Sequence, residues 1–237
     1  EQRVYPTFAV VAGRSSPRTG RPAITKIGEF DWAQVVHGSQ AVTLHREIPV
    51  EGEAETVDRV VAIYDKGTAA VVVTEADTTL LDGTPLWSTR SAIFIRNGGG
   101  FGGERGPSGA QHEPPDRDPD HVVAMATHPD QAYVYRLSGD RNPLHSDPTM
   151  ATSVGFPRPI LHGLCTYGFT GRALLRALCD DDPGRFRHIE GRFSAPVFAG
   201  EQLTVRIWET GPGEAVFTTQ VDDRVVIDQG LLRHGAA

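Results

Sequence analysis

The chain has 237 residues, 39% of them hydrophobic, and a formal net charge of −7. This length suits one large domain or two domains of about 120 residues, and the hydrophobic content is sufficient for a buried core. The negative charge creates no overall field that would attract nucleic acid or an anionic membrane. We therefore expect neither partner, and an anionic ligand must be met by local positive groups.

Further classes are excluded by what the sequence lacks. No hydrophobic run approaches the roughly 20 residues of a membrane helix, and no signal peptide is visible. The two cysteines, Cys165 and Cys179, have a spacing that fits neither a metal site nor a disulfide framework. We expect buried thiols in a reducing compartment and no metal. The chain opens at Glu1 without a methionine, in a strand-like run, so we expect that a natural N-terminal segment is absent.

The first part of the chain has the pattern of an antiparallel meander. Residues 5–12 form a short apolar run that predicts a strand or a buried edge, and residues 14–21 predict a loop. Turn signals at residues 65–67 and 82–84 separate strand-like segments. The expected strands are residues 40–48, 53–65, 68–79 and 85–96.

Residues 97–120 separate the two parts of the chain. A glycine cluster at residues 98–103 is followed by a run rich in Pro, Asp and Arg, which cannot bury enough surface to order itself. The glycines could cradle a phosphate, but no helix pattern follows them and the P-loop lysine is missing. We interpret the segment as a flexible linker.

The second part contains the strongest helix pattern. Residues 127–130 suggest a capped turn, residues 131–137 a strand, and residues 148–154 a short helix capped by Asp147. Apolar residues at helical spacing then predict a long helix over residues 161–178. The strands expected after this helix are residues 188–194, 202–210, 214–221 and 224–233.

The two parts resemble each other. Residues 49–53 (PVEGE) precede a long strand pair in the first part, and residues 196–201 (PVFAGE) precede another in the second. We infer an ancestral duplication from this match and from the order of the predicted elements. The parts differ because the first shows no comparable long helix.

Residues 135–148 hold the densest group of chemically useful side chains. Asp140 and His145 supply a carboxylate and an imidazole on a loop that Pro143 stiffens. If both reach one water, they can take a proton from it and move a proton at carbon, each transfer being worth about 10²–10⁴ in rate. The amide of Asn142 could orient that water. Ordinary turn chemistry is the alternative, because Asp, Asn, Gly and Pro are common turn residues.

A family resemblance rests on these residues. Residues 138–148 (SGDRNPLHSDP), followed by residues 159–163 (PILHG), resemble the hydratase motif of the MaoC-like, R-specific enoyl-CoA hydratases. The resemblance covers nearly the whole chain. It implies that Asp140 and His145 are catalytic and that Asn142 helps to hold the water.

The fold implied by the resemblance is an α+β double hot-dog, in which two antiparallel sheets surround a long central helix. The helix is kept in the C-terminal repeat and degenerate in the N-terminal repeat, as in the hydratase unit of peroxisomal multifunctional enzymes. The implied domains are a degenerate N-terminal repeat for acyl-chain and CoA binding (residues 1–96), the flexible linker (97–120) and a catalytic C-terminal repeat (121–237).

Several positions match ligand-contacting positions of the family. Gly163 would supply an oxyanion-hole N–H at the start of the long helix, where N–H groups lack partners; tight entry to the helix is a compatible alternative. Lys66 would meet a CoA phosphate, with a solvated turn lysine as the alternative, and Phe193 would line the groove, with a core aromatic as the alternative. We interpret His162 as structural rather than catalytic. The implied substrate-binding residues are His37, Gly38, Lys66, Arg141, Pro143, Leu144 and Phe193.

The leading hypothesis is reversible syn hydration of a (2E)-enoyl-CoA to the (3R)-3-hydroxyacyl-CoA. A hot-dog acyl-CoA thioesterase and a non-catalytic acyl-CoA-binding module are the alternatives. CoA enters as part of the substrate, so no cofactor is expected, and the resemblance implies a homodimer. The expected location is cytoplasmic in a bacterium or peroxisomal in a eukaryote. The degenerate first repeat suggests a long, branched or steroid-derived acyl chain by analogy with the family.

Overall fold

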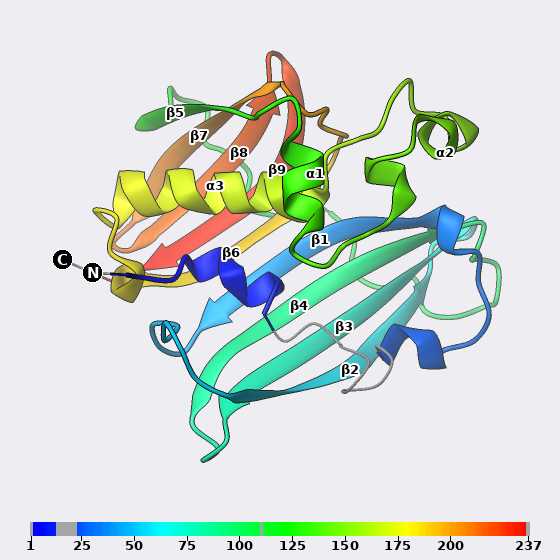
Figure 1. Ribbon diagram of the computed structural model, residues 1–237, viewed down its shortest axis with the longest axis horizontal. Helices are drawn as coiled ribbons and strands as arrows, with labels where there is room; N and C mark the ends of the chain where they lie inside the picture. The colour runs from blue at the N-terminus through cyan, green and yellow to red at the C-terminus, as the bar shows by residue number, and fades with distance from the viewer. Residues whose placement is uncertain (1, 13–22, 110, 236–237) are drawn as a thin grey trace.

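The computed structural model describes residues 2–12, 23–109 and 111–235, so the loop expected at residues 14–21 lies outside the described residues. Within the described part, nine strands form one antiparallel sheet with a long helix packed against it (Figure 1). The order of strands across the sheet is β2-β3-β4-β1-β6-β9-β8-β7-β5.

The strands fall into two groups along the chain. Those of the first half are β1 (Val35–Leu44), β2 (Ala54–Asp65), β3 (Ala69–Leu80) and β4 (Pro85–Arg96). Those of the second half are β5 (His121–Ala126), β6 (Phe186–Phe193), β7 (Gln202–Gly211), β8 (Glu214–Val221) and β9 (Arg224–His234). The strands predicted from residue 53 to residue 96, and those after the long helix, are thus confirmed within a few residues.

One helix is much longer than the others. It is α3 (Gly163–Leu178), and the two further α-helices among the described residues are α1 (Gln131–Arg136) and α2 (Pro148–Ser153). The 3₁₀ helices are η1 (Pro6–Val10), η2 (Ala23–Lys26), η3 (Trp32–Gln34), η4 (Pro143–His145) and η5 (Pro183–Arg185). None of the helices in the described part of the chain is long and apolar enough to cross a membrane.

The two halves of the sheet meet where β1 pairs with β6, with Val42 opposite Ile189. Counted outward from this seam, the first half has the order β1-β4-β3-β2 and the second has β6-β9-β8-β7, with β5 added at the edge. The PVEGE and PVFAGE segments precede β2 and β7, which occupy equivalent places. This repeated order agrees with the inferred duplication. The two sheets expected from the sequence are halves of one continuous sheet.

The main core lies between α3 and the second half of the sheet. Leu174 of α3 is fully buried, together with Ile207 and Phe217 of the strands. The buried hydroxyl of Tyr167 donates a hydrogen bond to the carbonyl oxygen of Ile189 at 2.8 Å. The helix begins at Gly163 rather than at residue 161, because His162 before it has a non-helical backbone with a ψ of 133°.

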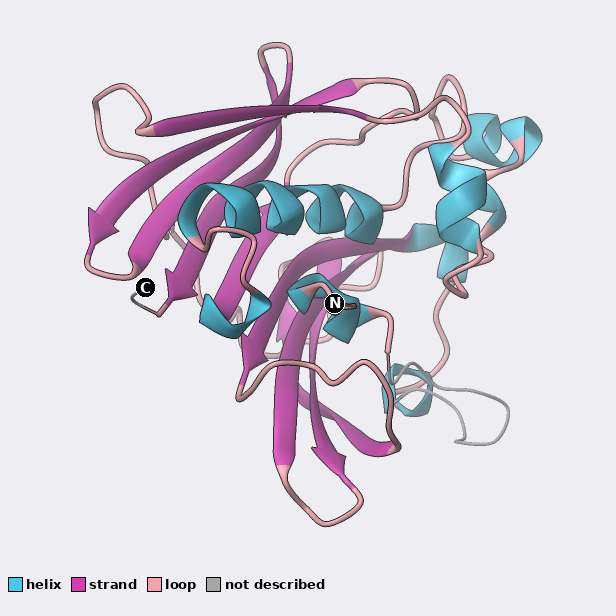
Figure 2. Cartoon of the chain, turned by 60° about the vertical axis from the view of Figure 1, so that its left-hand side comes forward, coloured by secondary structure: helices cyan, strands magenta, loops and turns pink. Residues whose placement is uncertain are grey.

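The first half carries short 3₁₀ helices on its sheet. Figure 2 shows the difference, with one long helix lying on the strands and only short helices elsewhere. η1 buries Ala9 and Val10 in the same core as α3. Of the two alternatives for residues 5–12, the strand is wrong, because Pro6 lacks an N–H for a ladder and suits the first position of a helical turn; the segment is nevertheless largely buried.

Three further expectations need correction. The strand expected at residues 131–137 is the helix α1, because Ala132 and Tyr135, three residues apart, both pack against the apolar core while the β-formers between them are exposed. No strand is predicted at residues 121–126, where the structure has the short edge strand β5. β1 begins at Val35 and ends at Leu44, since a bulge between His37 and Ser39 interrupts the alternating pattern.

The segment at residues 97–120 contains no helix or strand among its described residues. The carboxylate of Asp65 accepts hydrogen bonds from the N–H groups of Gly67, Gly100 and Gly102 at 2.8–2.9 Å. These bonds lower the pKa of Asp65. The glycine cluster therefore binds a carboxylate of its own chain, which holds the start of the segment on the β2–β3 turn. The domain limits given above stay a prediction.

Candidate active site

The loop between α1 and α2 is built from short side-chain-to-backbone turns. The side chain of Asn142 accepts a hydrogen bond from the N–H of Leu144 at 3.0 Å, which begins η4. The N–H of Asn142 donates to the carboxylate of Asp140 at 3.2 Å. Asp147 accepts from the N–H of Thr149 at 2.8 Å and caps α2, as predicted. These local bonds fix the loop at both ends.

His145 has a defined tautomer. Its Nδ1 lies 2.9 Å from the carbonyl oxygen of Ile160. A carbonyl oxygen only accepts, so Nδ1 carries the proton and Nε2 keeps a lone pair. Burial lowers the pKa of His145 below its ordinary 6.5, and the bond to Ile160 and the charge of Asp140 oppose this shift. The lowered pKa favours the neutral form of His145, in which Nε2 can accept a proton.

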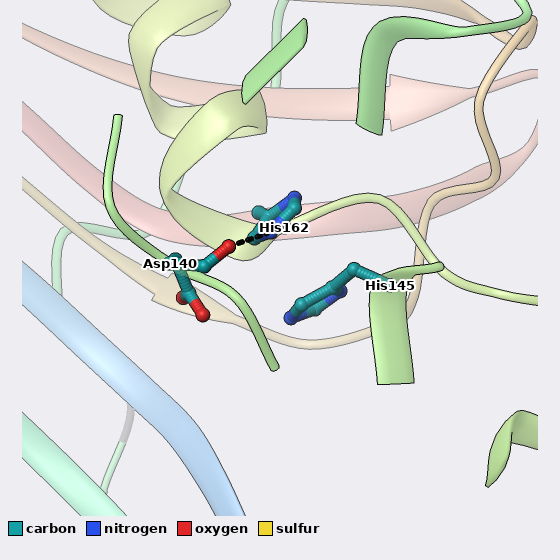
Figure 3. A group of neighbouring side chains, drawn as sticks. All are labelled: Asp140, His145 and His162. Carbon is teal, nitrogen blue, oxygen red and sulfur yellow. Dashed lines mark hydrogen bonds between the residues drawn. The ribbon is translucent and has the colours of Figure 1, made fainter. Parts of the chain in front are cut away.

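Asp140, His145 and His162 form one cluster, with the ligand atoms of the three side chains within 4.8 Å of one another (Figure 3). A ring nitrogen of His145 points toward the carboxylate of Asp140, and the ligand atoms of the two side chains are no more than 4.8 Å apart. His162 donates from Nε2 to the carbonyl oxygen of Asp140 at 3.2 Å. Its ring stacks on the ring of His145, with 3.8 Å between centroids.

The same three residue types could ligate a metal ion, since two imidazoles and a carboxylate are common ligands. Imidazole lone pairs lie in the plane of the ring, and the two rings face each other with an interplanar angle of 27°. In addition, Nε2 of His162 is used by the carbonyl of Asp140. The ring nitrogens therefore do not converge on one point, and this arrangement fits a proton-transfer pair better than a metal site.

Gly163 brings the start of α3 close to Phe193 at the end of β6. A Cβ at position 163 would lie 3.3 Å from the ring of Phe193, so glycine permits this contact. The first intrahelical bond runs from the N–H of Cys165 to the carbonyl of His162, and the N–H groups before it have no place in the helical ladder. They lie at the positive end of the helix dipole, where an oxyanion would be stabilised.

A cavity of about 760 Å³ brings together four residues implied by the resemblance, namely His37, Gly38, Lys66 and Phe193. The ring of His37 contacts the ring of Phe193, with 5.0 Å between centroids. The ammonium of Lys66 donates to the carbonyl of Pro107 at 3.0 Å and lies 5.7 Å from the ring of Tyr64. The other basic side chains that line the cavity are Arg90, Arg96, His112 and Arg192.

The remaining implied binding residues lie outside this cavity. Arg141 and Pro143 are exposed and Leu144 is half-buried, and none of the three is among the described residues that line it. The carbonyl of Arg141 accepts from the guanidinium of Arg136 at 2.7 Å, which ties the loop to α1. His162 touches both members of the pair, a contact that the sequence interpretation missed. Its place beside Gly163 in the PILHG segment was the available signal.

The continuous sheet and its long helix, with the strand order repeated about a seam, define a double hot-dog protein. Residues 110–229 match the family described as MaoC like domain, and residues 1–97 match the MFE-2 hydratase 2 N-terminal domain. The crystal structure of a MaoC-like dehydratase from Phytophthora capsici aligns with a TM-score of 0.89 and 35% identity, covering 98% of this chain and 83% of that one.

Named relatives agree with these matches. The 3-hydroxyacyl-thioester dehydratase Y of Mycobacterium tuberculosis is 45% identical over 246 residues, covering 100% of this chain and 83% of the relative. Enoyl-CoA hydratase ChsH3 of the same organism is 45% identical over 213 residues, covering 88% and 73%. The chain belongs to the MaoC-like dehydratase family, with an N-terminal part of the hydratase 2 type. The resemblance stated from the sequence is confirmed.

Proposed function

We propose that this protein catalyses the reversible hydration of a (2E)-enoyl-CoA to the (3R)-3-hydroxyacyl-CoA. The observation that carries the proposal is the facing pair of Asp140 and neutral His145 beside the first turn of α3, in a member of this family. The relatives named as an enoyl-CoA hydratase and a 3-hydroxyacyl-thioester dehydratase support it.

In this proposal, one water binds between the carboxylate of Asp140 and Nε2 of His145. The pair removes a proton from the water as its oxygen bonds to C3 of the alkene. The electrons of the double bond move toward the thioester oxygen, where the N–H of Gly163 stabilises the enolate. The pair then returns a proton to C2 on the same face. The groups end in their starting protonation states, so the only change is addition of water.

The other assigned residues have binding roles. The Oδ1 atom of Asn142 accepts from Leu144, so its amide N–H₂ is the group that would hold the water. Lys66 would meet a CoA phosphate at the rim of the cavity, and His37, Gly38 and Phe193 would line the path from there to the start of α3. The exposed Arg141, Pro143 and half-buried Leu144 would contact the ligand from the loop.

The test is incubation of the purified protein with a series of trans-2-enoyl-CoA substrates of increasing chain length. Hydration abolishes the ultraviolet absorbance of the conjugated thioester without releasing thiol, and the product is resolved by chirality. We expect a preference for chains longer than crotonyl. Release of free CoA would support a thioesterase instead, and tight binding with unchanged absorbance would support a non-catalytic module. Formation of the (3S) product would contradict the proposed face.

Two finer expectations belong to the same proposal. We expect a homodimer, which light scattering coupled to size-exclusion chromatography would detect. A monomer with full activity would contradict that expectation. The compartment, whether bacterial cytoplasm or peroxisome, stays a prediction that localisation of the tagged protein in its own cells would test.

A further inference from the structure

We infer that His162 is a positioning residue that sets the geometry of both Asp140 and His145. The inference rests on the proposed function, because it assigns a role within that acid–base pair. It goes beyond the family resemblance, which implied no role for His162, and it gives a specific task to a residue interpreted from the sequence as structural rather than catalytic.

His162 is anchored by α3. It is the residue just before the helix, and its carbonyl accepts hydrogen bonds from the N–H groups of Cys165 and Thr166 at 3.0 and 3.2 Å. Its side chain is buried, with 2% of the residue exposed. A group fixed on the end of the long helix α3 has little freedom, so it can hold the neighbouring loop in place.

Its first contact fixes Asp140. The bond from Nε2 of His162 to the Asp140 carbonyl joins the catalytic loop to the start of α3 across 22 residues of sequence. The neighbouring bonds of this loop are local, from Asn142 to Asp140 and from Leu144 to Asn142. Local bonds set the shape of the loop but not its place relative to Gly163, and the bond from His145 to Ile160 holds only the far side of the loop. The bond from His162 sets the place of Asp140 relative to Gly163.

Its second contact fixes His145. The stacked rings restrict rotation of the His145 side chain, while the bond from Nδ1 to Ile160 sets its tautomer. Together they aim Nε2 of His145 toward the carboxylate of Asp140 (Figure 3). The ring of Tyr135 contacts His162 as well, at 4.8 Å between centroids, and links the stack to α1. Misplacement of a reacting group by about 1 Å costs about 10²-fold in rate, so these contacts are large enough to matter.

Two substitutions separate the contacts. His162→Gln keeps an N–H donor close to the place of Nε2 and removes the aromatic face, whereas His162→Phe keeps the face and removes the donor. We expect kcat to fall about 10-fold in the first and about 100-fold in the second, with KM changed less than about threefold. His188→Gln is the matched control: His188 is half-buried, bonds to Thr43 at 2.8 Å, and should retain kcat within about twofold.

The pH profile separates positioning from a merely structural role. The groups that face His145 are Asp140 on its own loop, His162 at the start of α3 and the carbonyl of Ile160. The charge of Asp140 raises the pKa of His145 against the effect of burial. His162→Phe removes the hydrogen bond to Asp140, so the carboxylate can move away from His145 and the pKa of His145 should fall. The acid limb of the kcat/KM profile should therefore move to lower pH in His162→Phe and stay in place in His162→Gln.

Thermal unfolding and circular dichroism establish that each variant is folded. The inference is overturned if the folded variants keep kcat within twofold of the original enzyme. It is also overturned if kcat falls only in proportion to the loss of folded protein, with no change in the pH profile.

A measurement on the unaltered protein covers the case in which both variants fail to fold. Nitrogen-15 NMR of the imidazoles must find the proton of His162 on Nε2 and that of His145 on Nδ1. A proton on Nδ1 alone in His162 would remove the bond to Asp140 and end the inference. Because this readout needs no substrate, it is independent of whether the protein hydrates enoyl-CoA. An inactive protein with these tautomers would contradict the proposed function while confirming the bond from His162 to Asp140.

Discussion

The two halves of the sheet share a strand order and differ in what packs on them. The second half carries the 16-residue helix α3, whose first turn faces the Asp140 loop. The first half carries 3₁₀ helices of three to five residues and contributes His37, Gly38 and Lys66 to a cavity. In the proposed function, the second repeat would supply the rigid frame for the chemistry and the first would supply room for the ligand. Changes in the Asp140 loop and at the start of α3 should therefore act on kcat, and changes at the cavity residues of the first half on KM.

The largest expected effect is that of Asp140→Asn in the second half. The amide cannot accept a proton, so we expect hydration of enoyl-CoA to fall about 10³-fold, in line with the loss of one acid–base group. The KM should change little. Asp223→Asn, an exposed carboxylate in the β8–β9 turn, is the matched control. Full activity of Asp140→Asn would refute the assigned pair.

Gly163→Ala should give the next largest effect. The added methyl group would lie 3.3 Å from the ring of Phe193. Either the ring or the first turn of α3 must then move by a few tenths of an ångström. We expect a loss of about 10-fold to 100-fold in kcat. Gly168→Ala on the same helix meets nothing within 4 Å and should stabilise the fold by about 0.5–1 kcal/mol. Steady-state kinetics measure kcat in both variants, and thermal unfolding measures their stability. Equal kcat values in Gly163→Ala and Gly168→Ala would contradict the role of the contact between position 163 and Phe193.

Lys66→Ala tests the first half. Removing the ammonium at the cavity rim should raise KM about fivefold and leave kcat unchanged, because one exposed ion pair is worth about 1 kcal/mol. The effect should shrink as ionic strength rises. Lys26→Ala, an exposed lysine at the end of η2, is the control. A fall in kcat without a change in KM in Lys66→Ala would contradict the binding role assigned to the first half.

The smallest expected effect is on acid stability. The folded-state pKa of His145 is lowered, so the folded protein holds fewer protons than the unfolded chain just below pH 6.5. Its neutral form therefore contributes stability above pH 6.5, and that contribution is lost as pH falls toward the lower folded value. The acid limb of kcat/KM should likewise lie below pH 6.5. Denaturant titrations at several pH values give the free energy of unfolding of the original protein and of His145→Gln. If this free energy depends on pH in the same way in both proteins, the expected contribution of His145 is contradicted.

The candidate pair of Asp140 and His145 could be proposed from the sequence because its signal is local. Asp140 and His145 lie on one short motif, and the helix that faces them has a clear 3.6-residue period. The strands after residue 53 show alternating patterns bounded by turn residues. The family resemblance then placed Lys66 and Phe193 together, although they are 127 positions apart in the sequence, and the cavity contains both.

The errors have physical reasons. Tyr133, Val134 and Tyr135 are β-formers, and the packing of Ala132 and Tyr135 made them helical. The continuity of the sheet depends on main-chain pairing between β1 and β6, which leaves no mark on side-chain patterns. The two contacts of His162 arise from segments 22 and 17 residues away, and no local rule predicts that they meet.

The seam between β1 and β6 has a consequence for how the protein tolerates cutting. Both strands use their two edges for main-chain bonding, one toward the partner repeat and one toward their own. A nick between residues 97 and 120 would separate the repeats covalently yet leave this ladder in place. If the two repeats were produced as separate polypeptides, each would have a sheet edge with unpaired main-chain N–H and C=O groups. Pairing of β1 with β6 would cover both edges, so we expect the two pieces to reassemble with each other.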